Sequence, residues 1–197
     1  MTYSLLRYAH LVGVMLIGAG LIGVWLSDLR SRKVRDLSLF AEAVRNVAVF
    51  YDGVVVPGAV ILLLSGVWMT AEVWGGWGFM QYPWLAGMII LFVIEFVEGN
   101  TVTRVYFMRL RRLTNEALSQ GGVPAELNRA RQEHVPTFTH FLDMPMLLLI
   151  VSLGAIRPTT WAQFIVGAIC AVVVAAALTI WIPRLYPWVP PTYNKPS

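Results

Sequence analysis

The sequence predicts an all-α integral membrane protein, a multi-pass bundle of five transmembrane helices. Hydrophobic residues make up 57% of its 197 residues and charged residues only 13%, whereas about a quarter of the residues of a soluble domain carry charge. Several apolar runs exceed the roughly 18 residues that are typical of a membrane-spanning helix. The length suits one membrane domain over residues 1–197, without a second globular domain. The single cysteine, Cys170, excludes an intrachain disulfide and a CxxC motif.

Five segments have the length and composition of spans: residues 5–26, 47–70, 84–106, 137–156 and 161–182. Each has about 20 residues or more, enough for a hydrocarbon core of about 30 Å at 1.5 Å per residue. The first segment could instead be a signal peptide, but its apolar part is longer than a usual h-region and no A-x-A cleavage site follows it. We therefore expect it to remain as a span.

Two longer connections, residues 27–46 and 107–136, are predicted to be cytoplasmic loops because basic residues gather on their side of the membrane. Thirteen of the 15 lysines and arginines lie there: Arg30, Arg32, Lys33, Arg35, Arg45, Arg104, Arg109, Arg111, Arg112, Arg129, Arg131, Arg184 and Lys195. Only Arg7 and Arg157 lie on the other side. This bias predicts an N-terminus outside and a C-terminus in the cytoplasm, in a bacterial inner membrane.

The net charge of +4 therefore has a topological explanation, and the lipid bilayer rather than nucleic acid is the predicted partner. The second loop also has a predicted internal structure. Gly121 and Gly122 predict a break after a helical extension of the third span, and a short helix is expected to open near Pro124. A stop is expected at Pro136.

Ionisable residues interrupt three of the predicted spans. Glu95 and Glu98 in the third span, and His140 and Asp143 in the fourth, are each three residues apart and so share a helix face. The two spans run in opposite directions, and Glu98 and Asp143 both lie about 9 Å from the predicted inner boundary at 1.5 Å per residue. Asp52, near the inner end of the second span, falls at a similar depth. We expect the five residues to meet in the inner half of the membrane.

A charged residue at the bilayer centre costs roughly 2.5–3.5 kcal/mol, so such residues usually face the bundle interior or a watery cavity. Carboxylates with one histidine suit a divalent metal, and the same residues could instead relay protons or pass a cation. Structural alternatives exist. Asp52 could cap the second span, and His140 and Asp143 could satisfy each other and the backbone kinked at Pro145. A functional polar site is the favoured interpretation.

The first span carries a second candidate site, His10 with Gly13, Ile17 and Gly20 on one helix face. Glycines below a histidine leave room for a flat group such as haem b beside the helix. Small residues at this spacing also predict close packing against another helix. Locally, packing is the favoured interpretation.

Four motifs carry a resemblance to a known family. The stretches LLRYAHLVGVMLIGAGLIG and VRNVAVFYDGVVVPGAVILLLSGVW, followed by YPWL and FMRLRRL, resemble the uncharacterised bacterial integral membrane proteins known as domain of unknown function 2269. The resemblance covers about residues 1–158 and leaves the fifth span as an addition. The first span is also similar to those of CopD-like copper-resistance proteins and HemJ-like haem-binding oxidases, which implies His10 as a haem ligand. Glu95, Glu98 and His140 lie outside this pattern, which implies a function particular to a subgroup.

The sequence thus predicts a membrane cofactor-binding protein with a redox or electron-transfer role. The cofactor would be haem b at His10, or a divalent metal at the acid–histidine cluster, and a membrane redox partner or a second copy of the chain would be its partner. The alternatives are a proton or cation pathway through the cluster and a non-catalytic subunit or scaffold. Whether the protein is an enzyme stays open.

Overall fold

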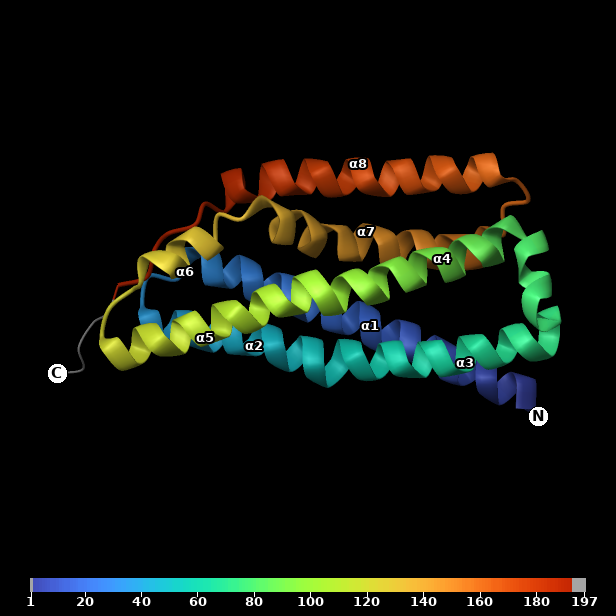
Figure 1. Cartoon of the computed structure of the whole chain (residues 1–197), viewed down its shortest axis with the longest axis horizontal. Coiled ribbons are helices and arrows are strands. Elements are labelled where there is room, and N and C mark those ends of the chain that lie inside the picture. The colour runs from blue at the N-terminus through green and yellow to red at the C-terminus, as the bar shows by residue number, and fades with distance from the viewer. Residues whose placement is uncertain (1, 193–197) are drawn as a thin grey trace.

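The computed structural model describes residues 2–192, and within that range the regular elements are helices apart from one isolated bridge between Asp36 and Thr192. Five helices are long and apolar enough to cross a membrane (Figure 1). They cover Thr2–Lys33, Leu37–Trp74, Pro83–Gln120, His134–Ile156 and Trp161–Leu185. The predicted all-α bundle with five spans is therefore confirmed.

Two of these helices, each 38 residues long, contain a five-residue π-helical turn. Such turns are rare and occur frequently at functional sites. The first helix consists of α2 (Leu37–Phe50), the turn η1 (Tyr51–Val55) and α3 (Val56–Trp74). The second consists of α4 (Pro83–Glu98), the turn η3 (Gly99–Thr103) and α5 (Arg104–Gln120). The remaining elements are α1 (Thr2–Lys33), η2 (Gly76–Gln81), α6 (Ala125–Ala130), α7 (His134–Ile156) and α8 (Trp161–Leu185).

The helix ends follow local chemistry. The carboxylate of Asp36 accepts hydrogen bonds from the Ser38 and Leu39 amides and so caps α2. Hydrogen bonds from the Ser38 hydroxyl and the Leu39 amide also lower the pKa of Asp36, so the cap stays charged. Gly121, at φ 68°, ends α5 in the left-handed conformation that glycine adopts without strain. The short helix α6 follows it, as the glycine break predicted.

The predicted helix stop at Pro136 is wrong, because α7 begins two residues earlier, at His134, and continues through Pro136. A proline in the first helical turn removes an amide that would have no intrahelical partner, so it does not interrupt the helix. Pro145, by contrast, lies inside α7. The helix of the fourth span thus begins three residues before the predicted span, within the predicted loop.

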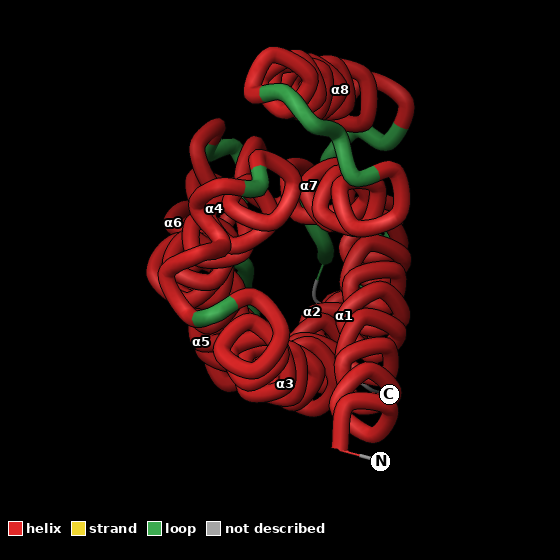
Figure 2. Tube along the Cα trace, turned by 90° about the vertical axis from the view of Figure 1, so that its right-hand side faces the viewer, coloured by secondary structure: helices red, strands yellow, loops and turns green. Residues whose placement is uncertain are grey.

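The long helices form a ring, and α8 lies outside this ring against α7 and α4 (Figure 2). Helix α1 packs along α2 and α3, and α4 packs along α7. One end of the bundle contains the α1–α2 turn, α6 and the end of α5, at the left in Figure 1. We call it the basic end. An apolar core of α1, α2, α5 and α6 side chains fills it, with Phe40, Leu110 and Leu127 fully buried.

Candidate functional site

Three carboxylates from two helices meet inside the bundle. Glu95 and Glu98 extend from the last turn of α4, and Asp143 extends from α7. One carboxylate oxygen of each residue lies within 4.8 Å of the others. Asp143 is only 6% exposed, and the two glutamates are half-buried. We call this group the carboxylate triad.

The charge of the carboxylate triad is not balanced by the protein around it. Glu95 Oε1, Glu98 Oε2 and Asp143 Oδ2 are buried and have no hydrogen-bond partner in residues 2–192. No ion pair within that range includes any of the three. A buried carboxylate without a partner is costly in its charged form, so it takes up a proton or a cation. The triad has the chemistry of a cation or proton site.

Hydroxyl groups beside the triad were not predicted from the sequence. The Thr103 hydroxyl donates to Glu98 Oε1 at 2.7 Å and lies 3.0 Å from the Thr139 hydroxyl. The Tyr51 hydroxyl lies against Gly99, where a Cβ atom would come within 2.6 Å of the phenol oxygen. The missing side chain of Gly99 therefore makes room for a phenol directly after Glu98. Tyr51, Gly99 and Thr103 begin or end the two π-helical turns, a feature that hydropathy does not reveal.

Asp52 was predicted to join the cluster, but the structure places it on the outside of the bundle. Its Oδ1 accepts a hydrogen bond from Arg104 Nε at 2.9 Å, and the two side chains are 46% and 41% exposed. Successive residues of a helix point about 100° apart. Because Tyr51 faces inward, Asp52 faces outward. Its pairing with Arg104 also places it near the level of Arg104 rather than at the predicted depth of Glu98.

His140 was also predicted to join the cluster, and it lies elsewhere. Its side chain is 2% exposed, and Nε2 is 3.8 Å from Asp28 Oδ2. The imidazole packs against the aromatic rings of Phe107 and Phe141. Residues three apart on a helix differ by about 60° in direction and by about 4.5 Å along the axis. His140 therefore faces a different group of helices from Asp143.

The surroundings of His140 form a second polar cluster, which the sequence analysis missed. Asp28 accepts hydrogen bonds from Arg32 Nε at 2.9 Å and from Arg131 Nη1 at 2.8 Å. Arg131 Nη2 donates to the Ser31 hydroxyl at 3.0 Å. Burial disfavours the charged guanidinium, but the Asp28 carboxylate outweighs this and raises the pKa of Arg131. The available signal was Asp28 itself, four residues before Arg32 on the same helix face. We call Asp28, Arg32, Arg131 and His140 the Asp28 cluster.

The predicted haem face of α1 is a helix contact in the structure. A Cβ atom at Gly13 would come within 2.9 Å of the Leu62 amide nitrogen, and one at Gly20 within 2.5 Å of the Val55 side chain. His10 itself reaches α3, where its Nδ1 lies 3.2 Å from the Ser65 hydroxyl. The space that a haem ring would need beside Gly13 and Gly20 is occupied by α3 and η1, so haem b does not fit this face. The glycines serve close helix packing.

Comparison with known proteins identifies the family but no activity. The family model described as a predicted integral membrane protein (DUF2269) matches residues 4–158, well over half of the chain. No curated protein and no solved structure matches the chain. The matched residues include α1 to α7 and the carboxylate triad, whereas α8 follows them. The chain belongs to the DUF2269 family of predicted integral membrane proteins.

Proposed function

We propose that this membrane protein binds a divalent cation at the carboxylate triad. The observation that carries the proposal is Asp143, whose side chain is almost fully buried with Oδ2 unpartnered. That carboxylate lies within 4.8 Å of Glu95 and Glu98. Three acids gathered without a basic residue leave a deficit of positive charge, and a divalent cation supplies it.

The donor atoms favour a hard cation. Carboxylate oxygens suit Mg²⁺, Mn²⁺ or Ca²⁺, whereas soft metals prefer sulfur ligands. Metal–oxygen distances of about 2.0–2.6 Å place ligand oxygens roughly 3–5 Å apart around one ion, and the spacing within the triad supports such a site. Waters would complete the coordination. A manganese ion at the triad would also provide the redox role that the sequence predicts.

A second candidate function is passage of protons through the same carboxylates. His140 supports it, because this residue lies about one helical turn from Asp143 in the direction of the basic end. Neither ring nitrogen of His140 has a hydrogen-bond partner among the described residues. Acids and a histidine buried within a membrane bundle are typical of proton relays, although here His140 and Asp143 face different helices. Here protons, rather than a metal ion, would neutralise the triad.

Metal binding by the purified protein tests the first proposal. After dialysis against Mn²⁺, Mg²⁺ or Ca²⁺, elemental analysis should find one bound ion per chain in the wild type. Asp143→Asn and Glu95→Gln should lose it, since each removes a charged ligand. Glu72→Gln, which changes an exposed glutamate of α3, is the matched control and should retain the ion.

His140→Gln distinguishes the triad from the larger cluster predicted from the sequence. The variant should bind the ion as the wild type does, because His140 faces Asp28. Equal binding by wild type and Asp143→Asn would refute the metal site. Proton flux in liposomes then tests the second function. Flux that Glu95→Gln abolishes would support it, and an absence of flux in the wild type would refute it.

A further inference from the structure

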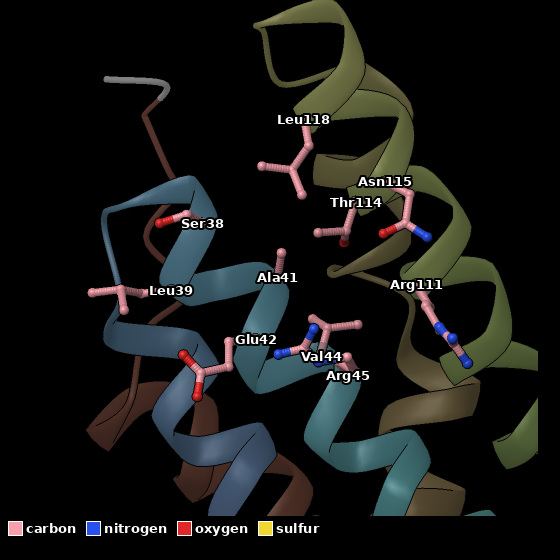
Figure 3. A pocket seen from close by; sticks show the side chains of 10 residues that line it. All are labelled: Ser38, Leu39, Ala41, Glu42, Val44, Arg45, Arg111, Thr114, Asn115 and Leu118. Carbon is pink, nitrogen blue, oxygen red and sulfur yellow. The ribbon is translucent and has the colours of Figure 1, made fainter. Parts of the chain in front are cut away.

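A groove between α2 and α5 at the basic end carries positive charge from both of its walls. It has a volume of about 470 Å³. Figure 3 shows Ser38, Glu42 and Arg45 on the α2 side and Arg111 and Asn115 on the α5 side. The groove lies outside the carboxylate triad and the Asp28 cluster, and neither function proposed above uses it.

Two guanidinium groups of this groove are available for a ligand. Among the described residues, neither Arg45 nor Arg111 takes part in an ion pair. Five other arginines of this end have acidic partners: Arg32 and Arg131 with Asp28, Arg104 with Asp52, Arg109 with Glu133, and Arg112 with Glu116. Arg30, Arg35, Arg129 and Arg184 are not in any ion pair among the described residues either, but they do not line the groove. Glu42 is the one acid in the lining, so the groove keeps a net positive charge. Guanidinium groups suit the oxygens of a phosphate, which they can bind through two parallel hydrogen bonds.

The position of the groove along the bundle selects the kind of phosphate. Trp84 and Arg104 lie 20 residues apart in one continuous helix, which gives about 30 Å, the thickness of a hydrocarbon core. With Trp84 at one face of the bilayer, the exposed Asp52–Arg104 pair would lie at the other face. Arg45 precedes Asp52 by seven residues and Arg111 follows Arg104 by seven, so both Cα atoms lie about 10 Å beyond this level. Long arginine side chains reach the headgroup layer from there.

An apolar track joins the groove to the membrane boundary. Val49 on α2 is 58% exposed, and Val105 and Met108 on α5 are 54% and 58% exposed. All three lie between the arginines and the Asp52–Arg104 level. A basic groove followed by exposed apolar side chains matches a phosphate followed by an acyl chain, whereas a soluble phosphate compound would leave the apolar part unused.

We propose that this groove binds the headgroup of an anionic phospholipid. In Figure 3 the Arg45 and Arg111 side chains point away from each other, so both would turn into the groove to hold the phosphate from opposite walls, with the Asn115 amide on the α5 side as a further donor. The lipid tail follows Val49 and Met108 toward the bilayer. Basic pockets between transmembrane helices bind anionic lipid headgroups in this way.

Native mass spectrometry of the delipidated full-length protein tests the proposal, with phosphatidylglycerol and phosphatidylcholine as probes. The wild type should retain phosphatidylglycerol in preference to phosphatidylcholine. The double variant Arg45→Gln/Arg111→Gln should weaken phosphatidylglycerol binding by about tenfold or more, since each arginine near an anionic surface contributes about 1 kcal/mol. Arg30→Gln/Arg129→Gln changes two exposed arginines of the same end outside the groove and is the control.

Three results would overturn the proposal. Equal losses in the two double variants would mean a general attraction of the basic end. Unchanged binding in Arg45→Gln/Arg111→Gln would exclude the groove. Displacement of the lipid by millimolar inorganic phosphate would identify a soluble phosphate as the ligand. Both arginines are exposed, so folding should survive; should it not, Arg45→Lys/Arg111→Lys keeps the charge, removes the planar fork and should still weaken binding.

Discussion

Two buried polar clusters lie about one helical turn apart along α7, and they differ in how their charge is balanced. In the Asp28 cluster, one carboxylate receives hydrogen bonds from two arginines, each at less than 3 Å. In the carboxylate triad, three acids lie together, and one oxygen of each has no partner among the described residues. His140 belongs to the first cluster and Asp143 to the second.

The difference shows which cluster the fold needs and which it tolerates. Opposite charges that are hydrogen-bonded to each other offset much of the cost of burial, and here they join α1 to the segment between α6 and α7. Like charges without partners do not offset the cost of burial, and they favour the binding of a cation or protons. We therefore expect mutations in the first cluster to act on stability, and mutations in the second to act on ligand binding.

Asp28→Asn should have the largest effect, because it breaks the balanced cluster. The substitution leaves Arg32 and Arg131 buried without a counter-charge, since both pair with Asp28 alone among the described acids. Removing one partner from a buried ion pair costs about 3–5 kcal/mol. Thermal or denaturant unfolding in detergent measures this loss. The control Arg112→Gln removes an exposed pair with Glu116 and should cost less than about 1 kcal/mol; a similar loss in both variants would contradict the comparison.

Asp143→Asn tests the other cluster, the carboxylate triad, in which the charge has no partner. Without cations the variant should be at least as stable as the wild type, because it removes a buried charge that lacks a partner. With Mn²⁺ at about 100 times its Kd, the wild type should gain about 2.7 kcal/mol and the variant nothing. The wild-type gain should shrink as the pH is lowered, since protons compete with the metal for carboxylates. Unfolding curves with Mn²⁺ and with chelator measure both effects, and an equal gain in the two proteins would contradict the site.

The sequence predicted the five spans and the three residues that meet in the carboxylate triad, but not the positions of Asp52 and His140. Physical reasons explain which predictions succeeded. Spans follow from composition over about 20 residues, which is a local property. The depth of Asp143 and Glu98 follows from a fixed rise per residue, and the structure brings these two residues together. The direction of Asp52 and His140 depends on rotation about the helix axis and on the neighbouring helices. Arg131 is 103 residues from Asp28, and such a pairing leaves no local pattern.

Gly13→Ala tests whether cation binding at the carboxylate triad depends on the packing of α1. A methyl group there would meet the backbone of Leu62 at 2.9 Å, which cannot move as a side chain can. Overpacking of this kind costs typically about 1–3 kcal/mol. Gly18→Ala is the control, because its methyl group would make an ordinary contact of 3.7 Å with Leu147. Both variants should keep the bound cation, since the triad lies on α4 and α7, and loss of the ion from Gly13→Ala alone would show that the triad depends on α1 packing.

Asp52→Asn should have the smallest effect and decides whether the outer ion pair belongs to the site. The pair with Arg104 is more than 40% exposed on both sides, and exposed ion pairs contribute about 0–1 kcal/mol. Because Asp52 points away from the triad, cation stoichiometry should stay at the wild-type value while stability changes by less than about 1 kcal/mol. Elemental analysis and unfolding of the same preparation measure both quantities. Loss of the ion in Asp52→Asn would mean that Asp52 turns inward with Tyr51, and the site would then draw on three helices instead of two.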